Sequence, residues 1–428
     1  MDCVMKKLWT MLLVIAMIFT MASLPAMAAD VTLSLLIDNT TNTAGLEAVA
    51  AEIEEKLGIA LEIEVRPGGA EGENVVRTRL AAGEMADLCY FNSGSLLPTL
   101  NPAQNFVDLT DMPYMATFTD SYKVTVTVGD RIYGVPAGSS FCGAWLYNKA
   151  VYAELGLEVP HTWEELMANC EVIKNAGKTA VIASFADDWT SQLILLGDYY
   201  NVQQGNPNFA ADFDANKAKY ATDEYAFQAF AKMQEVFEKG YMNVDYNTNT
   251  YDYALQMLVE GDGVHYPMLT NALTNIAVNY GKEAADNIGV FGQPGDNADD
   301  HGITVWLPNS LYVFKNGQNV EKALEWIEYF VSPEGIAAYA SAVSAEGPYV
   351  VAGVEMPDDA YAGVKEMMPY FDAGKTAPAL EFITSVKGPN SPQICIECMG
   401  GMRSAEECAA EYDADVEKQA KQLGLAGW

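Results

Sequence analysis

Three short apolar segments alternate with two segments of helical periodicity near the start of the chain. Val31–Ile37, Leu61–Val65 and Asp87–Phe91 have the length and apolar character of buried strands. Helical spacing joins Leu46 to Leu57 and Arg77 to Ala82, and each of these helices is expected to end at the glycine that follows it. Because strands that alternate with helices form parallel sheets covered by helices, the fold class is α/β.

Small polar residues follow the first and the third of these strands. Asn39 and Thr40 come after the first strand, and Asn92 and Ser93 come directly after the third. Ligands of open α/β sheets gather beyond the carboxyl ends of the strands, where the connecting loops meet. We therefore expect these four residues to contact a polar ligand.

The remainder of the chain is dominated by helical signals. Capping boxes at Thr162–Glu165 and Ser404–Glu407 predict two helix starts, because each hydroxyl and glutamate satisfies backbone N–H groups of the first turn. Weaker strand signals occur at Ala180–Ser184, Asn287–Val290 and Ser310–Phe314. A chain of 428 residues is long enough for two domains.

The N-terminus has the pattern of a secretory signal peptide. Lys6 and Lys7 precede an apolar run from Leu8 to Phe19, and small residues then lead to Ala28. The run is shorter than the roughly 20 residues that span a bilayer. We expect residues 1–28 to be removed on export. Cys3 precedes the apolar run, so no lipid-bearing cysteine is expected at the cleavage point.

The charge balance excludes some partners. The chain carries 24 basic and 58 acidic residues, a net charge of −34. A negatively charged protein cannot neutralise phosphate groups, so it gains no binding free energy from the release of their counterions. Nucleic acid is therefore not an expected partner, and anionic lipid is disfavoured for the same reason.

The cysteines and histidines do not form a metal-binding pattern. Cys395 and Cys398 are the one close pair, and the three histidines of the chain are scattered. A zinc site would need two further ligands at suitable spacing, so neither a metal nor a cofactor is expected. Free thiols and a single disulfide both remain open for Cys395, Cys398 and Cys408.

The motifs of common hydrolases are missing from the sequence. No Gly-x-Ser-x-Gly and no phosphate-binding loop occurs, and three scattered histidines make a catalytic triad improbable. Paired carboxylates for glycoside hydrolysis remain an alternative, although any one pair is uninformative among so many acids. No catalytic residue is assigned.

Several aromatic residues stand beside polar, loop-forming residues. A sugar ring needs a flat aromatic surface for its C–H face and amides or carboxylates for its hydroxyls, because each hydroxyl left unpartnered costs about 1–3 kcal/mol. The aromatic candidates for sugar stacking are Phe91, Phe141, Trp189, Tyr266 and Trp306, and Asp188 is a polar candidate beside Trp189.

The region from Gly129 to Ile173 resembles the extracellular solute-binding proteins of family 1, the carbohydrate receptors of ABC importers that include maltodextrin-binding proteins. The motifs that carry this resemblance are Tyr133-Gly134-x-Pro136, Tyr147-Asn148-Lys149, Gly156 and Pro160-x-Thr162-Trp163-x-Glu165-Leu166. Weaker matches to the family's motifs, in the same order along the chain, run from about residue 31 to the end of the chain.

The resemblance implies a two-lobed, periplasmic-binding-protein-like clamshell, each lobe a mainly parallel sheet flanked by helices. It implies an N-terminal lobe of residues 29–138 plus 265–310 and a C-terminal lobe of residues 139–264 plus 311–428. The first crossing between lobes is expected within residues 137–144, with Pro136 and Gly138 setting the hinge. Phe141 would then lie at the mouth of the cleft.

The same resemblance implies a function. The protein would be an exported, periplasmic or extracellular, monomeric receptor that binds a sugar or oligosaccharide and delivers it to the permease subunits of an ABC importer. The ten candidate residues named above would line the cleft between the lobes. The alternatives are the same clamshell binding a peptide, a polyamine, a metal or another solute, and an exported carbohydrate-active enzyme.

Overall fold

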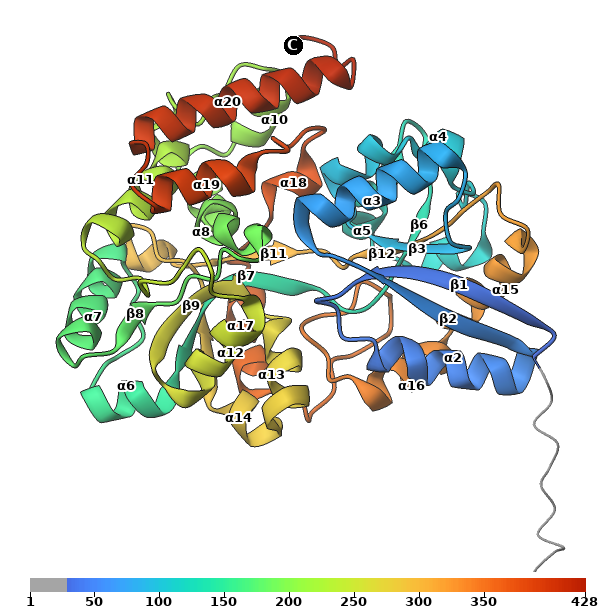
Figure 1. The fold of residues 1–428 in the computed structure, drawn as a ribbon, viewed down its shortest axis with the longest axis horizontal. Helices are drawn as coiled ribbons and strands as arrows, with labels where there is room; N and C mark the ends of the chain where they lie inside the picture. The colour runs from blue at the N-terminus through green and yellow to red at the C-terminus, as the bar shows by residue number, and fades with distance from the viewer. Residues whose placement is uncertain (1–28) are drawn as a thin grey trace, which may run out of the picture.

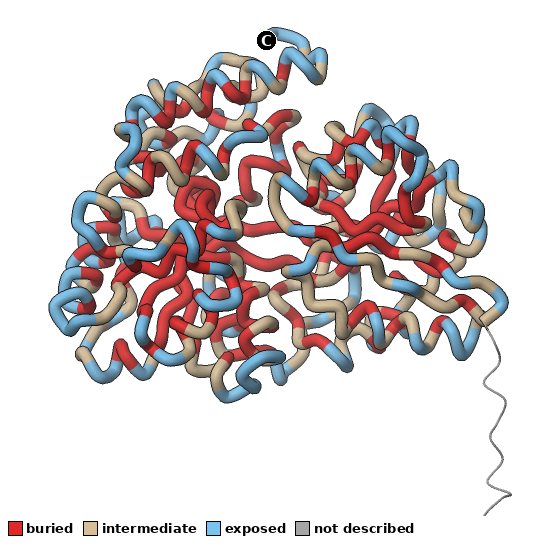
Figure 2. The backbone as a smooth tube through the Cα atoms, viewed as in Figure 1, coloured by how far each residue is buried: buried red, intermediate tan, exposed pale blue. Residues whose placement is uncertain are grey.

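The protein folds into two α/β lobes that lie side by side, as the computed structural model shows (Figure 1). The structure describes residues 29–428, and the expected signal peptide, residues 1–28, lies outside the described residues. Each lobe is built around one sheet whose strands are largely buried (Figure 2). The described helices include none with the length and apolarity needed to cross a membrane.

The sheet of the first lobe has five strands in the order β2-β1-β3-β12-β6. The strands are β1 (Val31–Asp38), β2 (Ile59–Arg66), β3 (Leu88–Phe91), β6 (Gly134–Pro136) and β12 (Ser310–Val313). β1 runs parallel to β2 and β3, as the alternating pattern predicts. β12 runs antiparallel to both of its neighbours, so the sheet is mixed: four strands run in one direction and β12 runs against them.

The helices of the first lobe cover both faces of this sheet. They are α2 (Ala44–Leu57), α3 (Gly69–Ala82), η1 (Gly94–Leu100), α4 (Pro102–Asn105), η2 (Pro113–Thr117), α5 (Asp120–Thr125), α15 (Val320–Phe330) and α16 (Pro333–Ala342), with a small hairpin of β4 (Thr127–Val128) and β5 (Arg131–Ile132). The predicted helix that ends at Gly58 is confirmed. α3 begins eight residues before the predicted start, because its glycine-rich first turns carry little apolar periodicity.

The sheet of the second lobe is also mixed. Its strands lie in the order β13-β11-β7-β9-β8, and β10 pairs with β7. The strands are β7 (Phe141–Asn148), β8 (Thr179–Val181), β9 (Gly263–Leu269), β10 (Ile288–Phe291), β11 (Ile303–Trp306) and β13 (Thr376–Pro378). β7 is antiparallel to β9, β10 and β11, and only the outer pairs are parallel.

Helices make up about half of the second lobe. They are α6 (Lys149–Leu155), α7 (Trp163–Asn175), η3 (Asp188–Gln192), α8 (Leu193–Gly197), α9 (Tyr199–Gly205), α10 (Phe209–Asp214), α11 (Glu224–Glu238), α12 (Tyr251–Glu260), α13 (Ala272–Tyr280), α14 (Lys282–Asp286), η4 (Ala298–Asp300), α17 (Ala362–Asp372), α18 (Leu380–Ile383), α19 (Ser391–Met399) and α20 (Ala405–Gln422). Both predicted capping boxes are present, at the starts of α7 and α20.

The chain passes between the lobes at three places. β6 ends at Pro136 and β7 begins at Phe141, which confirms the position of the first crossing. Gly138 lies in this crossing with a φ of 146°, a conformation that favours glycine. The second crossing joins β11 to β12, and the third lies between α16, which packs on α2, and α17, which packs on β10.

These crossings divide the chain differently from the expected lobe boundaries. β9, β10 and β11 belong to the second sheet, so residues 265–306 lie in the second lobe. β12, α15 and α16 lie with the first sheet, so residues 310–342 return to the first lobe. The local strand signals in this region did not show which sheet each strand would join.

Candidate functional site

A cavity of about 150 Å³ lies between the two lobes, and residues from both lobes line it. The first lobe contributes the loops that follow β1, β2 and β3, together with the start of α3. The second lobe contributes the first residue of β7, the last of β11, η3 and the segment around α18. The carboxyl ends of the parallel strands thus meet at this cavity, as the strand–helix alternation predicts.

Three aromatic side chains line the cavity, and all three come from the second lobe. Phe141 and Trp306 lie opposite one another on β7 and β11, and Trp189 lies in η3. Trp189 packs on Tyr251 with 5.4 Å between the ring centroids. These three rings form one aromatic wall on the second-lobe side of the cavity.

Charged and amide side chains form the opposite wall. Asp38 ends β1, and its carboxylate accepts hydrogen bonds from the Thr40 and Thr41 side chains at 2.6 and 2.8 Å, which fixes the loop after β1. Arg66 ends β2 beside Asp38, because the two residues are partners in the parallel register. The Arg66 side chain is 5 % exposed and lies over the Phe91 ring.

A buried ion pair borders the aromatic wall. Lys387 lies 2.8 Å from the Glu381 carboxylate, and the two side chains are 10 % and 9 % exposed. The other oxygen of Glu381 accepts a hydrogen bond from the Trp306 indole N–H at 2.9 Å. This chain of contacts holds the Trp306 ring in place and neutralises the charge of Glu381.

Three buried polar atoms of cavity-lining residues have no hydrogen-bond partner among the described residues. They are the donors Arg66 Nε and Trp189 Nε1 and the acceptor Asn271 Oδ1. A buried polar group without a partner costs about 1–3 kcal/mol, so such atoms are rare in folded proteins. Two donors and one acceptor beside the cavity suit a ligand that both donates and accepts hydrogen bonds.

The two lobes touch each other beside the cavity. Asp188 of η3 lies against the first turn of α3, where an ideal Cβ at Gly69 would come within 2.2 Å of Asp188 Oδ1. Burial raises the pKa of Asp188, and the N–H groups of Trp189 and Ala70 at its carboxylate act in the opposite direction. Position 69 therefore needs glycine for two reasons. A Cβ would clash with Asp188, and the φ of 63° is a conformation that favours glycine.

The structure brings five of the ten predicted site residues to the cavity. Those that line it are Thr40, Asn92, Phe141, Trp189 and Trp306. Their contact with a ligand stays a prediction.

The other five predicted residues have different surroundings. Asn39 accepts a hydrogen bond from the Gly68 N–H at 2.9 Å, and Ser93 donates to the Pro308 carbonyl at 3.3 Å. Phe91 lies under Arg66, and Asp188 contacts α3. Tyr266 is 1 % exposed, and its hydroxyl lies 2.6 Å from Ser184 Oγ. It is buried because alternate residues of the central strand β9 face the helix-covered core.

Sequence reasoning missed several residues of this cavity. The missed residues that carry polar side chains include Arg66, Gln192, Asn271, Asn309, Glu381 and Lys387. Arg66 could have been found, because it ends the second strand just as Asp38 ends the first. Glu381 and Lys387 follow a short edge strand some 300 residues later, and no local pattern connects them with the loops of the first lobe.

The cysteines and acidic residues offer no metal site in the described part of the chain. No group of three or more His, Cys, Asp or Glu side chains there could hold a metal ion. The six described cysteines are buried free thiols. Burial raises the pKa of Cys395, which makes its thiol unreactive.

A partly buried carboxyl group, that of Glu346, lies beside the first crossing between the lobes. Glu346 lines a small cavity between the lobes, and its backbone N–H donates to Ser139 Oγ at 2.9 Å. Tyr90, Tyr339 and Tyr349 contribute to its surroundings and stay neutral at physiological pH, because their own pKa values are raised. Burial raises the pKa of Glu346 to about 7.

This raised pKa gives a prediction for stability against pH. Both the folded and the unfolded protein hold the Glu346 proton below about pH 4.5, and the unfolded chain alone releases it between that pH and about 7. The contribution of Glu346 to the free energy of unfolding is therefore full at acidic pH and is lost as the pH rises to about 7. Glu346→Gln should raise the melting temperature at pH 8 by about 2–4 °C and leave it unchanged at pH 4. Glu355→Gln, at an exposed position, is the control, and equal shifts at both pH values would contradict the prediction.

Comparison with known families and proteins gives a consistent result. The model of the bacterial extracellular solute-binding protein family matches residues 48–363. A multiple sugar-binding protein of Streptococcus mutans serotype c is 23% identical over 275 residues, which is 62% of this chain and 63% of that protein. The alignment thus spans less than two thirds of that relative.

Solved structures share the whole architecture. A chitin oligosaccharide binding protein superposes with a TM-score of 0.78 at 20% identity, covering 91% of this chain and 99% of that chain. The solute-binding protein RafE in complex with raffinose superposes with a TM-score of 0.74 at 20% identity, covering 90% of this chain and 99% of that chain. A Bacillus licheniformis sugar transporter in complex with stachyose superposes with a TM-score of 0.70 at 17% identity, again covering 90% of this chain and 99% of that chain. These likenesses confirm the two-lobed fold.

Proposed function

Because this chain belongs to the bacterial extracellular solute-binding protein family, we propose that it captures a sugar or oligosaccharide in its interlobe cavity and delivers it to the permease of an ABC importer. Members of this family are exported, substrate-binding proteins and not enzymes. The periplasm or the cell exterior is the proposed location, with a monomer as the working form.

The observation that carries the proposal is the set of unpartnered atoms beside the aromatic wall. Arg66 Nε and Trp189 Nε1 offer hydrogen bonds, and Asn271 Oδ1 accepts them. A sugar hydroxyl does both at once, and the C–H face of the ring suits the Trp306 and Phe141 surfaces. A relative named as a multiple sugar-binding protein and neighbours solved with raffinose and stachyose support the same ligand class.

The charges of the cavity favour a neutral ligand over a polyamine or a metal. Glu381 is neutralised by Lys387, Glu73 pairs with Arg77, and the Asp38 carboxylate is occupied by its own loop. The described residues hold no cluster suited to a metal ion. A cationic ligand would therefore find no free carboxylate pair and would meet the Arg66 guanidinium.

Closure of the lobes is the proposed mechanism of signalling. The lobes touch in the described conformation, since Asp188 of the second lobe contacts the first turn of α3, and the proposal takes this conformation as the closed state. A ligand that bridges the aromatic wall and the polar wall binds this closed state better than an open one, and so shifts the population towards it. The permease would recognise the closed form.

Titration with a panel of saccharides tests this function. We expect at least one mono- or oligosaccharide to change the intrinsic tryptophan fluorescence saturably, because Trp189 and Trp306 line the cavity. The same saccharide should reduce the radius of gyration measured by small-angle scattering. Peptide and polyamine panels are the controls. A folded protein that responds to no saccharide, or that responds to a peptide or a polyamine instead, would reject the proposal.

A further inference from the structure

A small cavity of about 40 Å³ lies where the three crossings between the lobes meet. The Ala137 N–H donates to the Asn309 carbonyl at 2.9 Å, which joins the first crossing to the second. The Ser140 N–H donates to the Pro348 carbonyl at 2.8 Å, which joins the first crossing to the third. Residues of all three crossings line the cavity, so a movement of one lobe about the other changes its shape.

Glu346 of the third crossing is the one charged side chain among the described residues that line this cavity. Its backbone is held in place, because the Glu346 N–H donates to Ser139 Oγ at 2.9 Å. The described lining includes no lysine, arginine or histidine, so an ionised Glu346 has no counter-charge there. A carboxylate that is withdrawn from water without a partner is destabilising.

The titratable groups around Glu346 are tyrosines from several elements. They are Tyr90 of β3, Tyr251 of α12, Tyr339 of α16, Tyr349 of the third crossing and Tyr361 at the start of α17. The pKa of each tyrosine is raised by burial, so all five are neutral at physiological pH. Burial raises the pKa of Glu346 to about 7. Glu346 is therefore the member of this group whose charge changes near neutral pH.

Both lobes enclose the Glu346 cavity. Thr40 and Asn42 line it from the first lobe, and Asn271 and Asn275 line it from the second. Asn275 Nδ2 donates to the Thr40 carbonyl at 3.3 Å and so joins the two lobes. Separating the lobes would break this hydrogen bond and admit water to the Glu346 carboxylate. Ionisation of Glu346 therefore costs more free energy in the described conformation than in an open one.

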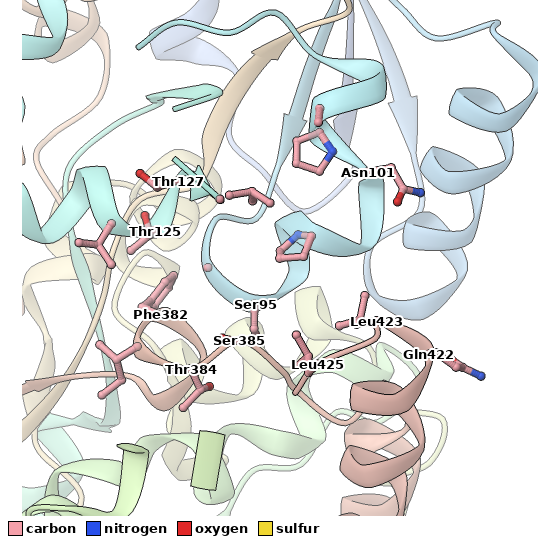
Figure 3. Close-up of a pocket in the computed structure, with 18 of the residues that line it drawn as sticks. Ser95, Asn101, Thr125, Thr127, Phe382, Thr384, Ser385, Gln422, Leu423 and Leu425 are labelled. Carbon is pink, nitrogen blue, oxygen red and sulfur yellow. The ribbon is translucent and has the colours of Figure 1, made fainter. Parts of the chain in front are cut away.

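The other acidic groups between the lobes have partners. Every acidic side chain that lines the candidate-site cavity pairs with a lysine, an arginine or threonine hydroxyls. Backbone N–H groups act as partners of the Asp188 carboxylate. A larger cavity between the lobes, of about 840 Å³, has no charged side chain in its described lining (Figure 3). Contact between the lobes thus leaves Glu346 as the acidic group without a partner.

We propose that ionised Glu346 opposes closure of the lobes, so that the protein binds its ligand more tightly at acidic pH than at neutral pH. This inference rests on the proposed function and describes the regulation of the same site. A proton on Glu346 removes the charge, and the closed state then encloses a neutral carboxyl group among neutral tyrosines.

The sign of the effect follows from the two states. An open state that exposes Glu346 to water releases its proton near the ordinary pKa of 4.5, whereas the closed state holds it up to about pH 7. Between these pH values, closure on a ligand takes up a proton, and affinity falls as the pH rises. Above about pH 7 both states are ionised, so affinity no longer changes with pH through this group.

Titration calorimetry with a saccharide that binds the wild type tests this regulation. The affinity should fall by about 10-fold or more between about pH 5 and pH 7.5, since each pH unit between the two pKa values changes it by up to about 10-fold. Repeating the titration near pH 6 in buffers of different ionisation enthalpy should show uptake of up to about one proton per saccharide bound.

Glu346→Gln keeps the shape of the side chain and removes its charge. This variant should match the wild-type affinity at about pH 5, keep that affinity at pH 7.5 and take up no proton on binding. Glu355→Gln, at an exposed position nearby in the chain, is the matched control and should behave as the wild type.

The outcomes separate this inference from the proposed function. A wild type that binds equally well at both pH values and takes up no proton would overturn the inference and leave the proposed function standing. A Glu346→Gln variant that keeps the wild-type pH dependence would also overturn it, because another group would then be responsible. If no saccharide binds at any pH, the proposed function fails and the inference fails with it.

Discussion

Replacing Trp189 by alanine is expected to weaken saccharide binding by about 30–150-fold. The change removes the aromatic ring by which η3 lines the candidate-site cavity of about 150 Å³. It also removes an indole N–H that has no partner among the described residues. Loss of an aromatic surface of this size corresponds to about 2–3 kcal/mol of binding free energy. Titration calorimetry with the saccharide that binds the wild type measures the loss.

Two further variants isolate the cause. Trp189→Phe keeps a ring but not the N–H, so most of the affinity should remain. Trp428→Ala removes a tryptophan that is similarly half-buried but far from the cavity, where it packs on Phe213 and donates to the Asp214 carbonyl. Its affinity should equal that of the wild type. A Trp189→Ala variant that binds as tightly as the Trp428→Ala control would contradict the assignment of the aromatic wall.

Local sequence patterns predicted the first lobe well. The strands that begin at Val31 and Leu88 and the helix that ends at Gly58 each follow from spacing and caps that lie within a few residues. The polar residues after β1 and β3 lie near the cavity because parallel strands bring their carboxyl ends together. Short-range information is enough wherever consecutive elements are also neighbours in space.

The second lobe could not be divided correctly by the same reasoning. β11 and β12 are separated by three residues, yet they join different sheets. Whether Tyr266 faces a ligand or the core depends on the strands beside β9, which come from positions about 80 and 120 residues earlier in the chain. Local periodicity contains no information about such partners.

The candidate site was predicted in part for the same reason. Trp189 and Trp306 were found because aromatics in loops beside polar residues are a local signal. The ion pair of Lys387 and Glu381 was missed, since its role depends on Trp306, about 75 residues away. The close contact at Gly69 was missed as well, because a glycine pattern does not show what approaches it.

The last prediction concerns closure of the lobes at Gly69. Gly69→Ala is expected to weaken binding of every saccharide by about 10–100-fold, because the new Cβ displaces the Asp188 carboxylate from the first turn of α3. A hydrogen bond to a charged group contributes about 1.5–3 kcal/mol, and separating the lobes would break this one. Small-angle scattering should show that saturating saccharide closes this variant less completely. Gly83→Ala is the matched control, since Gly83 has a similar φ of 72° with no atom within 4 Å of an ideal Cβ. Both variants carry the same backbone strain and should lose similar thermal stability. Equal affinities in the two variants would show that contact between Asp188 and α3 does not favour closure.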